Sequence, residues 1–97
     1  MFRLNLAMRT LTVLLMRRNQ AIYPTRSLTQ EIEREMDRIL EECDKDVLEM
    51  EIEKHANRVR TLLRHPLFDY ASPERQDKIT VIFVKIQSKM EWTYQDE

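Results

Sequence analysis

Glycine is absent from the 97-residue chain. It makes up about 7% of average proteins, so roughly seven would be expected in a chain of this length. Glycine supplies the positive φ of tight hairpin turns, and it lets a backbone approach a phosphate group closely. Its absence argues against a turn-rich β fold, and it excludes the glycine-rich phosphate-binding loops of nucleotide-binding enzymes.

Disulfides, net charge and membrane-spanning runs are lacking as well. The single cysteine, Cys43, cannot form an internal disulfide, which suits a reducing compartment. The net charge of -1 gives no reason to expect nucleic acid or an anionic membrane as the main partner. No run reaches the roughly 18 apolar residues of a membrane-spanning helix. We therefore expect a cytoplasmic protein that binds no membrane and does not act mainly by direct binding of nucleic acid.

The residue types that carry catalysis are present without a catalytic arrangement. His55 and His65 are ten residues apart, and neither has a second His or Cys at zinc spacing. Ser27 and Ser72 precede expected helices and are better explained as helix caps than as nucleophiles. We therefore expect no catalytic residue, no metal site and no cofactor, and the chain is not expected to be an enzyme.

Apolar residues recur at steps of three and four over most of the chain, which is the spacing of amphipathic helices. The sequence predicts an all-α fold: a small helical bundle in one domain, residues 1–97. The expected helices cover residues 3–19, 28–43, 46–64 and 73–91. Two runs are also compatible with strands: residues 2–9 alternate between apolar and polar side chains, and residues 79–86 are rich in β-branched residues.

The longest periodic segment, residues 28–63, is the expected centre of the bundle. Its apolar seam shifts phase after Met50, which indicates a bend or a break. The expected place is Asp44 to Asp46, with Asp46 and Glu49 able to cap a second helix. The alternative is one continuous helix with two apolar faces, which would need partners on both sides.

Prolines and short polar residues indicate the helix boundaries. Ser27 with Gln30 forms a capping-box pattern, and Ser72 followed by Pro73 is a strong helix start. The segment 65–70 contains the proline that ends the preceding helix. It is expected to be a loop that carries three large apolar side chains.

Charge is segregated along the chain. Residues 1–26 contain five basic and no acidic residues, whereas residues 27–54 contain eleven acidic and four basic ones. One interpretation is that the basic first helix packs against the acidic second. The other is that the two regions steer and orient a charged partner surface.

Large hydrophobic residues occur where a chain of this size can hardly bury them all. Aromatic residues and arginine are the usual anchors of protein interfaces. The predicted partner-binding residues are Arg17, Arg18, Pro66, Leu67, Phe68, Tyr70, Trp92 and Tyr94. The alternative is that these residues close the core.

The three prolines allow one more hypothesis. Pro66 could be presented to a host prolyl isomerase, because X-Pro bonds in loops exchange slowly between cis and trans without catalysis. The simpler interpretation is that Pro24, Pro66 and Pro73 only separate helices.

The length, the missing glycine, the mixed charge, the lack of a catalytic motif and the start Met1-Phe2-Arg3-Leu4-Asn5-Leu6 resemble small host-takeover proteins of phages. In length and character the chain is most similar to the anti-RecBCD proteins of lambdoid phages. The resemblance implies a non-catalytic protein in the host cytoplasm. Such a protein binds the recombination nuclease RecBCD, through RecC, and alters how that enzyme protects or degrades DNA ends, which favours phage recombination. Two other functions remain open: a helical assembly subunit that forms a homodimer, and a small nucleic-acid-binding regulator.

Overall fold

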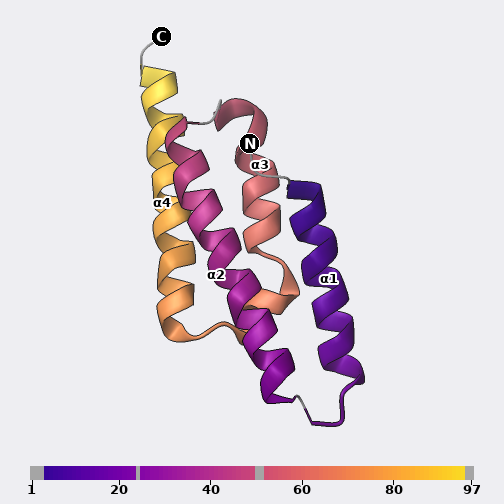
Figure 1. Ribbon diagram of the computed structural model, residues 1–97. Coiled ribbons are helices and arrows are strands. Elements are labelled where there is room, and N and C mark those ends of the chain that lie inside the picture. Colours follow the sequence, from indigo (N-terminus) through magenta and orange to yellow (C-terminus); the bar gives the residue numbers. More distant parts are fainter. Residues whose placement is uncertain (1–3, 24, 50–51, 96–97) are drawn as a thin grey trace.

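The computed structural model describes residues 4–23, 25–49 and 52–95, and it places the side chains of residues 4–23, 25–45 and 55–90. This part of the chain forms four α-helices and no strand, as the sequence predicts. The elements are α1 (Leu4–Gln20), α2 (Arg26–Glu49), α3 (Ile52–Leu63), a short 3-10 helix η1 (Pro66–Tyr70) and α4 (Pro73–Gln95) (Figure 1). Residues 79–86, for which a strand was the alternative, are helical, and so are residues 4–9, the described part of the other such run, 2–9.

The four helices form an elongated bundle in which the chain runs alternately down and up (Figure 1). α1 packs against α2 and α3, and α4 packs against α2 and α3. The chain therefore crosses the bundle diagonally between α2 and α3. The parallel pairs α1 with α3 and α2 with α4 form two opposite sides, here named the α1–α3 face and the α2–α4 face.

The core is built from the apolar stripe of each helix. In α2 the predicted seam of Leu28, Ile32, Met36, Ile39 and Cys43 is buried throughout. Each large aliphatic side chain removed from water contributes about 1.5–3 kcal/mol, so this stripe holds the helix in the bundle. The other helices contribute Ala7, Leu11, Leu14, Ala56, Val59, Leu62, Leu63, Ile79, Ile82 and Ile86.

The segment 65–70 differs from the expected loop. It forms η1, which contacts α1 and places Leu67 and Phe68 in the core. Gln76 of α4 donates a hydrogen bond to the carbonyl of Phe68 at 2.6 Å. Sequence reasoning identified the apolar side chains of this segment, but their burial depends on the space that the four helices leave between them.

The predicted break in the central helix was placed too early. α2 continues through Asp44, Lys45 and Asp46 and ends at Glu49, so Asp46 lies within the helix and does not cap the next one. The reason is tertiary: Cys43 is buried, and Asp44 pairs with Lys85 of α4, so contacts with the bundle override the local tendency of an acidic segment to turn.

One helix start was predicted correctly and one was wrong. α4 begins at Pro73, and the hydroxyl of Ser72 accepts a hydrogen bond from the backbone N–H of Arg75 at 3.4 Å. α2 begins at Arg26, two residues earlier than expected. Its cap is Thr25, whose hydroxyl accepts from the N–H of Leu28 at 3.1 Å, and Ser27 lies exposed in the first turn.

Candidate functional site

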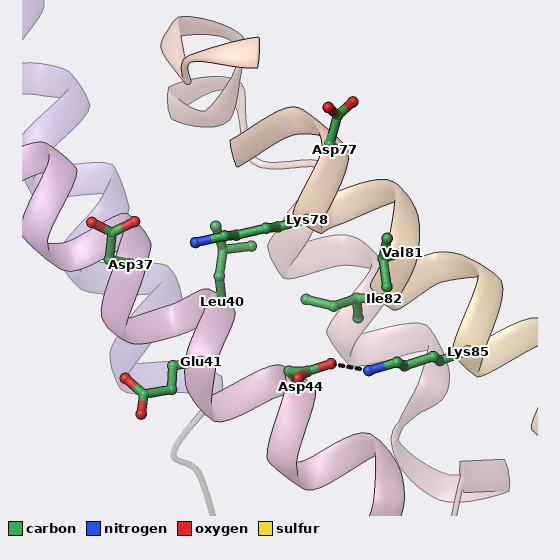
Figure 2. Close-up of a pocket in the computed structure, with 9 residues that line it drawn as sticks. All are labelled: Asp37, Leu40, Glu41, Asp44, Asp77, Lys78, Val81, Ile82 and Lys85. Carbon is green, nitrogen blue, oxygen red and sulfur yellow. Dashed lines mark hydrogen bonds and ion pairs between the residues drawn. The ribbon is translucent and has the colours of Figure 1, made fainter. Parts of the chain in front are cut away.

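A groove of about 500 Å³ runs between α2 and α4 on the α2–α4 face (Figure 2). Leu40 and Ile82 are its buried lining residues, and Val81 of α4, next to Ile82 in the sequence, lines it at 50% exposure. Charged side chains line the groove as well. They are Asp37, Glu41 and Asp44 from α2, and Asp77, Lys78 and Lys85 from α4.

The spacing of these residues explains why they meet at the groove. Asp37, Glu41 and Asp44 follow one another at steps of four and three, so they share one side of α2 next to the apolar stripe. On α4, Lys78 and Lys85 are two helical turns apart, with Val81 between them. The groove is thus the line where the flanks of two amphipathic helices come together.

Two ion pairs join α2 to α4 through the groove residues Asp37 and Asp44. The guanidinium of Arg75 donates through Nε to Oδ1 of Asp37 at 2.9 Å and through Nη2 to Oδ2 at 3.0 Å, a bidentate arrangement. These hydrogen bonds lower the pKa of Asp37 and raise that of Arg75. Nearer the other end of the groove, the ammonium of Lys85 lies 2.5 Å from Oδ1 of Asp44 (Figure 2). Both pairs connect α2 to α4.

Other charges at the groove make no contact across it. Glu41 lies 3.7 Å from Lys45 of the next turn, and both side chains are exposed. Asp77 and Lys78 have no ion pair with any described side chain within 4 Å. Figure 2 shows Lys78 extended across Leu40 toward α2, while Glu41 and Asp77 point away from the gap between the two helices. The groove therefore offers apolar side chains together with charges of both signs.

The groove lining combines apolar side chains with charged ones. The described residues of its lining include carboxylates and amines that are exposed or half-buried, and none of them is a histidine, serine or cysteine. Within the described part of the chain, no group of three or more His, Cys, Asp or Glu side chains is placed to hold a metal ion. What the lining can do is bury an apolar side chain on Val81 and pair with charges around it.

The buried His65 has a structural position. Its Nδ1 accepts a hydrogen bond from the N–H of Leu67 at 3.1 Å, so the proton of the neutral ring is on Nε2. Nε2 lies 3.1 Å from the hydroxyl of Thr12, which in turn donates to the carbonyl of Met8 at 2.9 Å. Burial lowers the pKa of His65. The imidazole thus fastens η1 to α1.

Two predicted partner-binding residues lie in the core. Leu67 and Phe68 are 0% and 2% exposed, so they have no surface to offer a partner in this conformation. For these two the alternative, that they close the core, is correct. Pro66 and Tyr70 flank them and are exposed.

The two predicted arginines contact other parts of the same chain. Nη1 of Arg17 donates to both carboxylate oxygens of Glu31 at 3.1 Å, which joins α1 to α2. The guanidinium carbon of Arg18 lies 3.5 Å from the centre of the Tyr70 ring, a cation–π contact. The pairing with Glu31 follows the interpretation in which the basic first helix packs against the acidic second.

Three further residues fall outside what the structure describes. Trp92 and Tyr94 lie on α4, but their side chains are outside the described ones, so their role stays a prediction. Pro24 is outside the described residues altogether.

Sequence reasoning predicted none of the groove residues. A signal was present in α4, where Val81 and Val84 lie off the buried stripe of Ile79, Ile82 and Ile86 and are half exposed. An apolar side chain on the solvent side of a charged helix indicates a possible contact surface. Which helix would form the other wall could not be read from the chain.

No described helix combines the length and apolar character needed to cross a bilayer. Comparison with known proteins gave no match: no protein-family model, no curated protein and no solved structure is significantly similar to this chain.

Proposed function

We propose that this protein is a non-catalytic binding protein that takes a helical segment of another protein into the α2–α4 groove. The observation that carries the proposal is that the half-exposed Val81 lines one groove with the buried Leu40 and Ile82 and with charged side chains of both signs. An apolar centre with a polar rim is the general layout of protein interfaces.

The dimensions of the groove fit a short amphipathic helix. The lining on α2 extends from Asp37 to Asp44, about 10 Å along the helix axis at 1.5 Å per residue. That length accommodates about two turns of a partner helix, whose apolar side chains would meet Val81. The charges of both signs at the rim would set the orientation of that helix.

The specific form of the proposal is a phage protein that acts in the host cytoplasm on RecBCD, through RecC. Its support is the whole-chain resemblance to the anti-RecBCD proteins of lambdoid phages. The missing glycine agrees with a protein that works through its surface, because the phosphate-binding loops of nucleotide-dependent enzymes need that residue. Binding would change how the nuclease treats DNA ends and so favour phage recombination.

The test is binding to purified RecBCD and to RecC alone, with two matched variants. Val81→Arg places a charge in the groove, and Val84→Arg makes the same change one turn away, outside the lining, at 57% exposure. We expect Val81→Arg to weaken binding at least about tenfold, which is about 1.4 kcal/mol, and Val84→Arg to bind as wild type. Circular dichroism checks that both variants are folded.

Each part of the proposal can fail separately. If wild-type protein binds neither RecBCD nor RecC, the named partner is wrong. If Val81→Arg binds as tightly as wild type, the partner uses another surface. A stable homodimer at low protein concentration, with Val81 in its interface, would favour the assembly subunit instead.

A second proposed partner is a host prolyl isomerase that would bind at Pro66. The supporting observation is that Pro66 is exposed at the first position of η1. Recovery of the isomerase from a bacterial lysate should fall with Pro66→Ala and not with Pro73→Ala. If wild type, Pro66→Ala and Pro73→Ala recover equal amounts of isomerase, this hypothesis is wrong.

A further inference from the structure

The α1–α3 face has a different electrostatic character from the α2–α4 face. α1 contains three arginines and no acidic residue, and residues 55–64 also contain three arginines and no acidic residue. α2, by contrast, contains nine acidic and four basic residues. The one acidic residue of α3, Glu53, lies outside the described side chains. Among the described side chains of α1 and of residues 55–64, the arginines are therefore not accompanied by any carboxylate.

Two of these six arginines remain available. The other four contact groups elsewhere in the fold, through the pairs Arg17–Glu31, Arg18–Tyr70, Arg60–Met90 and Arg64–Phe83. Arg9 on α1 and Arg58 on α3 are exposed, and neither pairs with a described side chain. Both guanidinium groups can therefore donate hydrogen bonds to a carboxylate from outside the molecule.

The surface between α1 and α3 is hollowed. A groove of about 300 Å³ has an apolar floor and a rim of neutral hydrogen-bonding groups and one cation, with no carboxylate among the described side chains of its lining. The floor is Leu4, Met8 and Leu62, and the rim is Asn5, Asn57, Arg58 and Thr61.

α1 also has exposed apolar side chains outside this groove. Leu6, Val13 and Met16 are each more than half exposed, and the helical period places them on the same side of α1 as Arg9. A strip of three large hydrophobic side chains around a cation is unusual for a surface that contacts only water.

We propose that the α1–α3 face binds an acidic amphipathic segment of a second protein, separately from the α2–α4 groove. The apolar side chains of that segment would cover Leu6, Val13 and Met16, and its carboxylates would pair with Arg9 and Arg58. A nucleic-acid backbone fits less well, because its phosphates would leave the apolar strip and floor uncovered. With two faces of different chemistry on opposite sides, the protein would bridge two partners.

The experiment uses a fluorescent synthetic helical peptide with leucines at i, i+3, i+4 and i+7 and glutamates elsewhere, and measures anisotropy at low ionic strength. Wild-type protein should bind it, and Arg58→Glu should weaken binding at least about tenfold, because like charges would then oppose each other. Lys78→Glu makes the same change in charge on the α2–α4 face and should bind as wild type. A peptide in which lysine replaces glutamate should not compete.

Four outcomes would overturn the proposal. The first is that wild-type protein does not bind the acidic peptide. The second is that Arg58→Glu and Lys78→Glu weaken binding of the peptide equally, which would indicate a general charge effect. The third is that the protein binds oligothymidylate but not the peptide. The fourth is that the solution mass rises with protein concentration in wild type but not in Arg58→Glu, which would mean that the face binds a second copy of this chain. Val81→Arg should bind the acidic peptide normally, so failure of the α2–α4 groove and failure of this face are distinguishable.

Discussion

The imidazole of His65 is held in a setting that suits only its neutral form. Nδ1 accepts a hydrogen bond from the N–H of Leu67. A proton at Nδ1 would make it a donor as well, so this hydrogen bond would be lost and two N–H groups would repel each other. The ring is also removed from water, which lowers its pKa. Protonation of this side chain therefore opposes the packing of η1 against α1.

Stability should consequently depend on pH through His65. Its pKa in the folded protein lies below the ordinary value of 6.5, so the unfolded chain takes up the proton first as pH falls. The contribution of the neutral ring is full above pH 6.5 and is lost progressively between that pH and the folded pKa. Urea unfolding at a series of pH values should show a steeper loss in wild type than in His65→Gln.

The carboxylates do not obscure this comparison. The pKa of Asp37 is lowered from 3.8 by its hydrogen bonds to Arg75, so its contribution is lost at a more acidic pH and in both proteins. Parallel curves for wild type and His65→Gln would show that the imidazole has no such effect.

Phe68 and Tyr70 are both aromatic residues of η1, but Phe68 is buried in the core and Tyr70 is exposed. Phe68→Ala should cost about 3–5 kcal/mol in the free energy of unfolding, because it leaves a cavity in the core. Tyr70 is 52% exposed, and Tyr70→Ala should cost about 0.5–1 kcal/mol through loss of its contact with Arg18. Chemical denaturation of both variants measures the difference. A small loss for Phe68→Ala would mean that η1 does not depend on this side chain.

At the scale of single elements, the sequence predicts the helices and their buried sides well. The seam from Leu28 to Cys43 is periodic, and a stripe of that width must be covered, so its burial follows from the pattern. The end of α2 was misplaced because Asp44 and Asp46 look like a turn locally. The pairing with Lys85 that keeps this segment in the helix comes from 41 residues further along the chain.

The start of α2 gives a test with a close control. Thr25→Ala removes the hydroxyl that accepts from the N–H of Leu28 and should cost about 0.5–2 kcal/mol. Ser27→Ala, two residues away and exposed in the first turn, should change stability by less than about 0.5 kcal/mol. Thermal or urea unfolding of the two variants decides which residue is the cap. A larger loss of stability for Ser27→Ala than for Thr25→Ala would instead support the capping box expected from Ser27 and Gln30.

The groove was less accessible to prediction than the helices. Sequence periodicity shows which side of a helix is apolar, but it does not show which helix lies opposite. Asp37 and Arg75 are 38 residues apart, and nothing local to either residue indicates that they pair. The same holds for the α1–α3 face, since nothing local to Arg9 or Arg58 indicates that α1 and α3 are neighbours.

At the scale of the whole molecule, one core serves all four helices and η1. Ile82 is almost fully buried in that core, so Ile82→Asp would bury an unpaired carboxylate and should unfold the chain. Ile39→Asp should do the same from α2. Val84→Asp, on the exposed side of α4, is the control and should leave the protein folded. Circular dichroism at room temperature measures the outcome, and a folded Ile82→Asp would contradict the single shared core.

The diagonal step from α2 to α3 divides the chain into two antiparallel hairpins, α1 with α2 and α3 with α4. A protein split between them, as residues 1–49 and 52–97, would yield two halves that each display half of an apolar interior. Neither half can shield that interior alone, whereas mixing them restores both long sides of the bundle. The two halves should therefore behave as a complementation pair, unstructured when expressed separately and helical when expressed together.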